Sequence, residues 1–211
     1  MKQAPVGIIG YGELGRQLEL LSHACGWKGD YFFFDDGCRE RGEANAYAFR
    51  DYRREAFRHL RFLVGIGYKN LQLRRAIFAE LAEMGCQVPA LLHPTAYVHP
   101  SAQLGAGVYV YPQCNVDKNV VLERGVLLNN SAVVSHDSRV GEASFLSPGS
   151  ILSGYCTVEA CVFLGAGTVV ANEVVIGEGA TVGIGTVVTG NLDSGGCYIG
   201  NPVRQVKHIG L

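Results

Sequence analysis

Residues 98–188 fall into blocks of six: VHPSAQ LGAGVY VYPQCN VDKNVV LERGVL LNNSAV VSHDSR VGEASF LSPGSI LSGYCT VEACVF LGAGTV VANEVV IGEGAT VGIGTV V. Every block opens on Val, Leu or Ile, so 16 successive sixth positions are aliphatic. In the first twelve blocks the residue four places later, from Ala102 to Thr168, is small or β-branched. This period predicts a parallel β-helix, in which each block forms a short strand and a corner, and three blocks complete a triangular coil of about 18 residues. The aliphatic side chains then stack inside the coil as one continuous core.

The composition divides the chain into two parts. Glycine makes up 28 of 211 residues, about 13% against an average near 7%, and charged residues make up only 18%. Residues 98–193 hold 13 of the glycines and 11 charged residues, whereas residues 1–97 hold 24 charged residues. The excess of glycine suits the left-handed corners of a coil. The formal net charge of −1 excludes a broadly basic nucleic-acid-binding protein.

The first part has the pattern of an ordinary α/β domain. Short apolar runs alternate with stretches of helical spacing, which predicts a small parallel sheet covered by helices. In the Arg-rich segment 50–61, interleaved acidic residues favour a solvated helical face over a phosphate-binding patch. We expect strands at 4–9, 31–34 and 61–66 and helices at 13–21 and 70–84. The predicted fold is a Rossmann-like βαβ domain over residues 1–92, a β-helix over 93–193 and a C-terminal tail over 194–211.

A glycine motif lies between the first expected strand and the first expected helix. Gly10, Gly12 and Gly15 have the spacing G-x-G-x-x-G, which allows a tight turn and lets a phosphate approach the N–H groups of a helix N-terminus. Asp35 and Asp36 end the next strand, where a carboxylate can accept a hydrogen bond from a ribose hydroxyl. The pattern favours a nucleotide or nucleotide-sugar site over a turn needed only for packing. A redox dinucleotide is disfavoured, because the domain is long enough for only about half of a doubly wound sheet.

His136 is the titratable residue of the β-helix that points most clearly to chemistry. It follows Val134 by two places, at an outward or corner position, and Asp137 comes next. The residue stacked one coil later is Gly154, which leaves space beside the imidazole. A histidine and an aspartate in such a place can act as a general base, although a plain surface histidine has the same pattern. Cys114 and Cys156 take inward small positions, which favours packing over nucleophilic roles.

The complete layout resembles the hexapeptide-repeat sugar acyltransferases, typified by sialic acid O-acetyltransferase and the N-acetyltransferase of the bacillosamine pathway. The similarity covers essentially the whole chain. It is carried by the stretches IIGYGELG (8–15), LNNS (128–131), SHD (135–137) and YIGNPV (198–203). The resemblance implies a left-handed β-helix, acetyl-CoA as co-substrate, no metal, and a homotrimer with active sites between subunits. It also implies a role in bacterial surface or glycoprotein glycan synthesis.

The resemblance further implies a role for each matching residue. His136 would be the general base, and Asp137, placed at a corner, would hold its ring. A backbone N–H near Gly154 would stabilise the oxyanion, and Asn129 would place the acceptor. Ala166 and Ile184 would line the path of the pantetheine arm of acetyl-CoA, and Arg204 and Lys207 would meet its phosphates. The nucleotide of the acceptor would be bound by Gly10, Gly12, Gly15, Asp35, Asp36 and Gly67.

One departure from the family bears on the acceptor. Many members have a second histidine nine residues after the base, whereas this chain has Phe145, which cannot form hydrogen bonds through its side chain. We therefore predict N-acetylation of a nucleotide-linked amino sugar, at a 4-amino group, with O-acetylation of a sialic-acid-like sugar as the alternative. Zinc-dependent hydration needs about three convergent histidines, and the β-helix offers His99 and His136. A non-catalytic trimer that binds nucleotide sugars is a further alternative, which the His136–Asp137 pair disfavours.

Cysteine usage and hydropathy indicate where the protein works. The seven cysteines are odd in number and contain no C-x-x-C pair, so free thiols in a reducing cytosol fit better than disulfides or a zinc site. No uninterrupted apolar run approaches the roughly 20 residues of a membrane-spanning helix, and the apolar stretch near residue 8 is too short for a signal peptide. We therefore expect a cytoplasmic enzyme.

Overall fold

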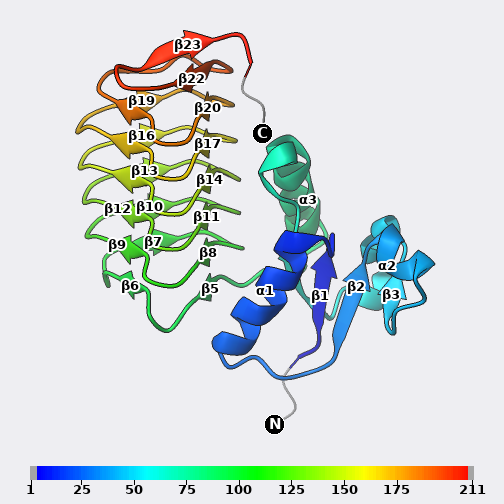
Figure 1. Cartoon of the computed structure of the whole chain (residues 1–211). Helices are drawn as coiled ribbons and strands as arrows, with labels where there is room; N and C mark the ends of the chain where they lie inside the picture. The colour runs from blue at the N-terminus through cyan, green and yellow to red at the C-terminus, as the bar shows by residue number, and fades with distance from the viewer. Residues whose placement is uncertain (1–3, 209–211) are drawn as a thin grey trace. The chain divides into compact units, whose positions relative to one another are not determined.

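The computed structural model describes residues 4–208. These residues form two compact units that divide between Leu91 and Leu92, and each unit is described by itself (Figure 1). In the described part of the chain, no helix combines the length and the apolar character that crossing a bilayer requires.

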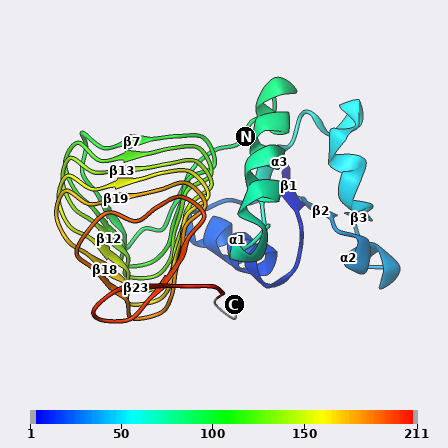
Figure 2. The same cartoon turned by 90° about the horizontal axis from the view of Figure 1, so that it is seen from above.

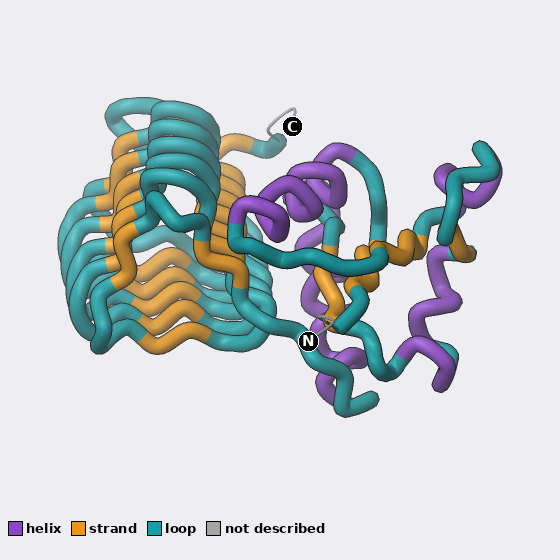
Figure 3. Tube along the Cα trace, turned by 90° about the horizontal axis from the view of Figure 1, so that it is seen from below, coloured by secondary structure: helices purple, strands orange, loops and turns teal. Residues whose placement is uncertain are grey.

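The N-terminal unit consists of β1 (Val6–Ile9), α1 (Glu13–Ala24), β2 (Tyr31–Phe34), α2 (Asp36–Glu40), β3 (Ala46–Tyr47), β4 (Arg61–Val64) and α3 (Leu71–Glu83). Its strands form a parallel sheet in the order β3-β2-β1-β4. Within the unit, α1 contacts β1 and β4, and α3 contacts β4. Figure 3 distinguishes the helices, strands and loops of the chain by colour. Parallel strands joined by such helical crossovers confirm the expected Rossmann-like βαβ fold.

Strand β1 is the buried centre of this sheet, because it pairs with both β2 and β4. Val6, Ile8 and Ile9 have no exposed surface, as expected of a parallel strand with neighbours on both edges and helices over its face. Gly7 makes room for an aromatic ring, since a Cβ there would lie 2.8 Å from a ring carbon of Phe62.

The Arg-rich segment forms short 3₁₀ helices, Phe49–Arg53 and Glu55–Phe57, instead of one regular helix. Arg53 donates hydrogen bonds of 2.8 and 3.0 Å to both carboxylate oxygens of Glu80 on α3. Tyr52 donates to the same carboxylate at 2.7 Å. The segment therefore packs against α3 through this carboxylate and is more than a solvated face.

The C-terminal unit is a parallel β-helix, and its strands stack into three sheets. Figure 2 shows the coils lying over one another with nearly the same outline. Sheet I holds β5 (Leu91–Leu92), β8 (Tyr109–Val110), β11 (Leu127–Leu128), β14 (Phe145–Leu146), β17 (Phe163–Leu164), β20 (Thr181–Val182), β22 (Cys197–Ile199) and β23 (Arg204–Val206). Sheet II holds β6 (Tyr97–Val98), β9 (Asn115–Val116), β12 (Val133–Val134), β15 (Ile151–Leu152), β18 (Val169–Val170) and β21 (Val187–Val188). Sheet III holds β7 (Gln103–Leu104), β10 (Val121–Leu122), β13 (Arg139–Val140), β16 (Thr157–Val158) and β19 (Val175–Ile176).

The predicted aliphatic positions form the core of the β-helix. Every sixth residue from Val110 to Val188 is buried, and none exposes more than 1% of its surface. Val98 and Leu104 are only half-buried, because they lie in the first coil, where one side of the core has no further coil against it. From β6 to β21 each strand is paired in register with the strand 18 residues away, for example Leu128 with Val110 and with Leu146.

The corners explain much of the glycine excess. The second residue of most corners has a positive φ, and glycine takes this place at Gly107, Gly125, Gly149, Gly167, Gly179 and Gly185. Other residues adopt the same left-handed conformation at Gln113, Asn119, Ser131, Asp137, Ala143, Tyr155, Cys161 and Glu173. Asn and Asp tolerate this conformation better than a bulky side chain does. Tyr155, with φ of 60°, is therefore the most unusual of these corners.

The ends of the β-helix differ from the six-residue rule. The first strand, β5, precedes Val98, where the regular six-residue period begins. After Val188 the buried side chains are those of Leu192 and Tyr198, which do not follow the six-residue spacing. The last strand, β23, runs antiparallel to β22 and forms the edge of sheet I.

The interior cysteines pack as small apolar residues. Cys114 and Cys156 expose 1% of their surface each, and their thiols donate to the carbonyl oxygens of Asn129 and Ala171, both at 3.0 Å. Burial raises the pKa of the Cys114 thiol to about 11 and also raises the pKa of Cys156. A thiol that resists ionisation is a poor nucleophile, in agreement with the packing role expected for both.

Candidate active site

His136 and Asp137 form the corner that joins β12 of sheet II to β13 of sheet III. Neighbouring residues on a regular strand face opposite ways, but Asp137 has φ of 58°, so its side chain turns to the same side as the imidazole. Nδ1 of His136 lies 3.0 Å from Oδ2 of Asp137. The pair is half-open to solvent, with 38% of the His136 side chain exposed. The corner geometry thus brings together the two residues whose pairing the sequence predicted.

Asp137 is itself held by the preceding coil. Nδ2 of Asn119, the residue stacked 18 positions earlier, donates to Oδ1 of Asp137 at 2.9 Å. This hydrogen bond, the one from His136 and the nearby charge of Lys118 together hold the pKa of the Asp137 carboxyl below its usual range. An ionised carboxylate only accepts hydrogen bonds, so Nδ1 of His136 carries the proton and Nε2 is left as an acceptor. A neutral imidazole in this tautomer can take a proton through Nε2.

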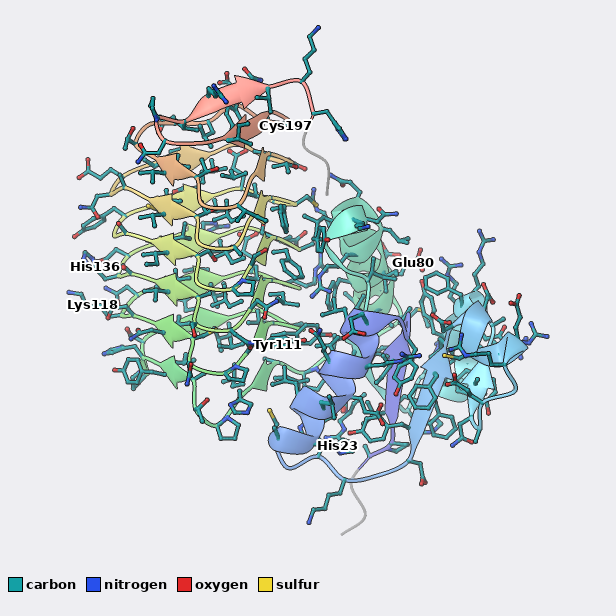
Figure 4. The ribbon with its side chains drawn as sticks, viewed as in Figure 1. His23, Glu80, Tyr111, Lys118, His136 and Cys197 are labelled. Atoms are coloured by element: carbon teal, nitrogen blue, oxygen red, sulfur yellow. The ribbon has the colours of Figure 1, made fainter. Side chains whose placement is uncertain are left out.

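Gly154 lies against the ring of His136 from the next coil. A Cβ at Gly154 would lie 2.7 Å from Cε1 and 2.9 Å from Nε2 of His136. Any residue other than glycine would therefore force the imidazole ring to move. On the other side of the stack, Lys118 occupies the equivalent position one coil earlier, and Figure 4 shows it beside His136 on the same edge of the β-helix. The bare backbone of Gly154 therefore faces the nitrogen that can accept a proton.

Tyr155 approaches His136 edge-on. Their ring centroids are 5.1 Å apart and the rings are nearly perpendicular, at 87°. The side chain is 57% exposed, and its backbone N–H donates to the carbonyl oxygen of His136 at 3.1 Å. Nothing in the six-residue pattern marks this tyrosine, so sequence reasoning missed it, and its left-handed backbone was not foreseen either.

The backbone N–H predicted to stabilise an oxyanion already has a partner. The N–H of Gly154 donates to Oδ1 of Asn172, the residue stacked on the following coil, at 2.9 Å. Asn172 is exposed, so its amide reaches this N–H from the surface of the edge. Sequence reasoning missed this contact, although the spacing of 18 residues could have indicated it.

The predicted site residues of the β-helix divide between two of its edges. His136, Gly154 and the neighbouring Asp137 lie at corners between sheets II and III. Asn129, Ala166 and Ile184 lie at corners between sheets I and II. The full width of sheet II separates these edges, so one chain does not bring the two groups together.

Asn129 and Phe145 have structural contacts of their own. Oδ1 of Asn129 accepts from the N–H of Asn130 at 2.8 Å, which closes the corner before β12. Phe145, in place of the family's second histidine, is buried and packs on Phe163 of the next coil with ring centroids 6.0 Å apart. It lies on sheet I and not at the corner of His136. In the described residues, no three His, Cys, Asp or Glu side chains gather as metal ligands.

A groove of about 610 Å³ lies at the end of the β-helix beside β22 and β23. It is lined by Gly195, Gly196, Cys197, Gln205, Val206 and Lys207. Lys207 therefore borders an open groove, as a phosphate-binding role requires, whereas Arg204 is exposed on β23 outside this lining. Ile184, at the edge between sheets I and II, is 75% exposed and presents an apolar surface.

The glycine motif of the N-terminal unit follows β1, and a second glycine loop follows the neighbouring β4. A Cβ at Gly15 would lie 2.3 Å from the carbonyl oxygen of Gly10, and one at Gly65 would lie 2.1 Å from the same oxygen. These glycines are needed for packing, and Gly65 is one that sequence reasoning left unassigned. Gly12 and Gly67, in contrast, have nothing within 4 Å of a Cβ position, which leaves space at the carboxyl ends of both strands. Ligands of parallel sheets bind at such ends.

Asp35 and Asp36 hold the loops around this space. Asp35 accepts from the N–H of Tyr11 at 2.9 Å and from the N–H of Cys38 at 3.0 Å, which lowers the pKa of its carboxyl although burial acts the other way. Asp36 accepts from the N–H of Phe49 at 3.0 Å. The ring of Tyr11 lies on Phe33, with centroids 4.1 Å apart. Both aspartates thus serve the structure of the loops.

Solved structures share both units in one chain. The acetyltransferase domain of PglB from Neisseria gonorrhoeae FA1090, in complex with acetyl coenzyme A, is 30% identical and has a TM-score of 0.89, with 97% of this chain and 100% of that chain covered. The chain belongs to the hexapeptide-repeat sugar acyltransferases. PerB from Caulobacter crescentus, in complex with CoA and GDP-perosamine, is 29% identical to this acyltransferase, with a TM-score of 0.87 and 97% of each chain covered.

Further comparisons agree on the fold of the acyltransferase. Residues 87–191 match the family model described as the GMPPB C-terminal domain. WeeI from Acinetobacter baumannii AYE is 22% identical, with a TM-score of 0.86 over 97% of this chain, and shares the fold. The β-helix is left-handed, as in these neighbours, and the resemblance expected from the sequence is confirmed. The roles of the individual site residues stay predictions.

Proposed function

We propose that this acyltransferase moves the acetyl group of acetyl-CoA onto the amino group, at C4, of a nucleotide-linked amino-deoxy sugar. The observation that carries the proposal is the chain of contacts from Asn119 through Asp137 to His136, which ends at Nε2 beside the bare backbone of Gly154. Two proteins that this chain resembles were solved with acetyl coenzyme A, and with CoA and GDP-perosamine. Surface glycan or glycoprotein glycan synthesis is the use we propose for the product.

His136 acts as the general base in this reaction. As the sugar amine attacks the thioester carbonyl carbon, Nε2 takes the proton that the amine loses, and the C–S bond then breaks as the proton passes to the CoA thiolate. Asp137 keeps the proton of Nδ1 in place and stabilises the imidazolium that forms. The N–H of Gly154 is the donor for the developing oxyanion, which requires Asn172 to release it. An amine, once neutral, is a better nucleophile than a hydroxyl, and this favours the N-acetylation over the O-acetylation of a sialic-acid-like sugar.

Acetyl-CoA binds along the β-helix in this proposal. The groove beside β22 and β23 is open, and Lys207 on its border can meet a phosphate. Arg204, exposed on the same hairpin, adds a second positive charge. Ala166 and Ile184 line the path of the pantetheine arm on the edge between sheets I and II.

A homotrimer completes the site. Because His136 and the Ala166–Ile184 column lie on different edges of one β-helix, a subunit supplies the base and its neighbour the pantetheine surface. Sheet II supports this assembly, since its outward column includes Tyr97, Ile151 and Val169, which are exposed apolar residues. An exposed apolar column of this kind favours burial against another subunit.

The nucleotide-binding domain predicted over residues 1–92 binds the nucleotide in this proposal. Gly12 and Gly67 provide space for the diphosphate at the ends of β1 and β4, and Gly10 and Gly15 shape the turn. Asp35 and Asp36 offer acceptors to the nucleoside, and Asn129 places the sugar. Residues 93–193 then carry catalysis, and the tail predicted over residues 194–211 meets CoA, with residues 209–211 outside the described part of the chain. We place the reaction in the cytoplasm, in keeping with the seven cysteines, none of which forms a disulfide in the described residues.

The decisive experiment measures thiol release from acetyl-CoA with a panel of nucleotide-linked 4-amino and 3-amino sugars and free sialic acids. Turnover of a 4-amino sugar, with a product that gains an amide, is the expected result. Turnover of sialic acid alone would favour the O-acetyltransferase alternative. If no sugar is acetylated, the enzyme proposal fails, and full activity of the His136→Ala variant would refute the assignment of the base.

A further inference from the structure

The side-chain amide of Asn172 is hydrogen-bonded to the N–H of Gly154, the donor that the proposed acetyl transfer uses. Its Oδ1 accepts from the N–H of Gly154 at 2.9 Å, and because this N–H can only donate, the orientation of the amide is fixed. Gly154 lies against Cε1 and Nε2 of His136, and its N–H is the donor that the proposed function assigns to the oxyanion. A carbonyl oxygen that is to bind this N–H must first displace Oδ1 of Asn172.

Side chains also cap outward N–H groups elsewhere on this β-helix. Glu123 accepts from the N–H of Glu142 at 3.0 Å, and Asn191 accepts from the N–H of Val175 at 2.8 Å. Such caps satisfy backbone donors that would otherwise face only water. The cap on Gly154 is the one that lies directly beside the imidazole. Its asparagine is exposed, so the side chain can swing into solvent, and the N–H of Gly154, which is a buried residue, is then left for another acceptor.

We propose that Asn172 is a displaceable plug of the oxyanion donor, which lowers the affinity of the enzyme for acyl-CoA while leaving the affinity for free CoA unchanged. The proposal rests on the function proposed above, in which the N–H of Gly154 binds the thioester oxygen. Acetyl-CoA has to exchange one hydrogen bond for another at this N–H. CoA has no thioester carbonyl and leaves the plug in place. The plug thus shifts the ratio of the two affinities away from acetyl-CoA and toward CoA.

The test compares binding of acetyl-CoA and of CoA to the full-length protein by isothermal titration calorimetry. Loss of one neutral hydrogen bond that competes with the ligand corresponds to roughly a 2- to 10-fold change in affinity. We expect Asn172→Ala to bind acetyl-CoA about 2- to 10-fold more tightly than the wild type, with CoA binding unchanged. Asn172→Asp, whose carboxylate is a stronger acceptor for the N–H, is expected to shift the ratio of the two affinities the opposite way.

Asn191→Ala is the matched control, because it removes a cap of the same kind from the same β-helix. It is expected to leave the ratio of acetyl-CoA to CoA affinity unchanged. A plain structural cap at Asn172 would lower the thermal stability of Asn172→Ala without changing that ratio, and this outcome overturns the proposal. A fall in acetyl-CoA affinity overturns it as well. If the wild type bound neither acetyl-CoA nor CoA, the proposed function itself would fail, which the titration separates from the other outcomes.

Discussion

The imidazole of His136 lies in space that the missing side chain of Gly154 leaves open, one coil further along the β-helix. A methyl group on Gly154 would lie 2.7 Å from Cε1 of the ring, well inside contact distance. The φ of Gly154 is not in the left-handed region, so alanine has no backbone strain to overcome there. Glycine is therefore needed at this position to make room for the imidazole ring and not to allow the backbone conformation of the corner.

Gly154→Ala is expected to lower kcat/KM by about 100-fold, because a shift of about 1 Å in a catalytic group has effects of that size. The melting temperature should stay close to that of the wild type. Gly190→Ala is the control, since Gly190 lies 36 residues on from Gly154 at the same edge and has open space around it. Wild-type kinetics of Gly154→Ala would contradict the role of this space.

Asp137→Asn tests the tautomer of the base. An asparagine at this position can offer an N–H to Nδ1, which would place the ring proton on Nε2 and remove the acceptor, so kcat should fall by at least about 100-fold. Steady-state kinetics at pH 7 to 8 measure this. A fall in KM alone, with kcat retained, would show that Asp137 does not orient the ring.

The same carboxylate sets a pH dependence of stability. Its pKa is lowered in the folded protein, so the stabilisation that it contributes is complete above the unfolded value of about 4 and is lost as pH falls through the folded pKa. We expect the difference in melting temperature between wild type and Asp137→Asn to be largest at neutral pH and to shrink below about pH 4. If the difference in melting temperature grew as the pH fell, the pKa of Asp137 would be raised in the folded protein and not lowered.

Tyr155→Gly separates strain from function. Tyrosine in the left-handed conformation costs on the order of 1 to 2 kcal/mol, which glycine avoids. Since the ring is largely exposed, the free energy of unfolding should stay the same or rise by up to about 1 kcal/mol. The edge contact with His136 is lost, and kcat should fall by roughly 2- to 10-fold. Chemical denaturation and steady-state kinetics on one preparation measure the free energy of unfolding and kcat. A large loss of stability would contradict the proposed backbone strain at Tyr155.

Ile151→Lys tests the trimer. Ile151 is an exposed apolar residue on sheet II, and a charge in a buried subunit interface is costly. We expect monomers by light scattering, loss of activity, and a circular dichroism spectrum like that of the wild type. Val175→Lys, at a similarly exposed apolar residue on sheet III, should remain trimeric and active. Dissociation by both variants, or by neither, would speak against an interface on sheet II.

Gly65→Ala and Gly12→Ala distinguish packing from ligand binding in the N-terminal unit. A Cβ at Gly65 would meet the backbone oxygen of Gly10, so this variant should unfold at a clearly lower temperature. Gly12 has open space around it, so Gly12→Ala should keep its melting temperature and raise KM for the nucleotide sugar. An unchanged KM for Gly12→Ala would remove this glycine from the nucleotide site.

The repeat was predictable because each aliphatic residue meets its own equivalents 18 residues away. The register of the strands then follows from counting residues. The same count predicts the buried positions from Val110 to Val188 and places Asp137 at a corner. The same counting could have shown that His136 and Ala166 lie on different edges. The same spacing could also have indicated the contact of Asn172 with Gly154. The contact of Tyr155 with His136 could not be predicted in this way, since it depends on how an exposed side chain turns at a corner. Gly65 was missed because its need for glycine comes from a neighbouring strand and not from its own loop.

The antiparallel strand β23 has a consequence for the size of the molecule. A stack of parallel coils ends in a row of backbone groups onto which a further coil, or another copy of the protein, can add without limit. At this end of sheet I the final strand runs in the opposite direction and presents Arg204 and Gln205 to water. Charged and polar side chains on an edge strand oppose pairing with a further strand, so this hairpin disfavours the end-to-end association that would turn stacked coils into a fibre.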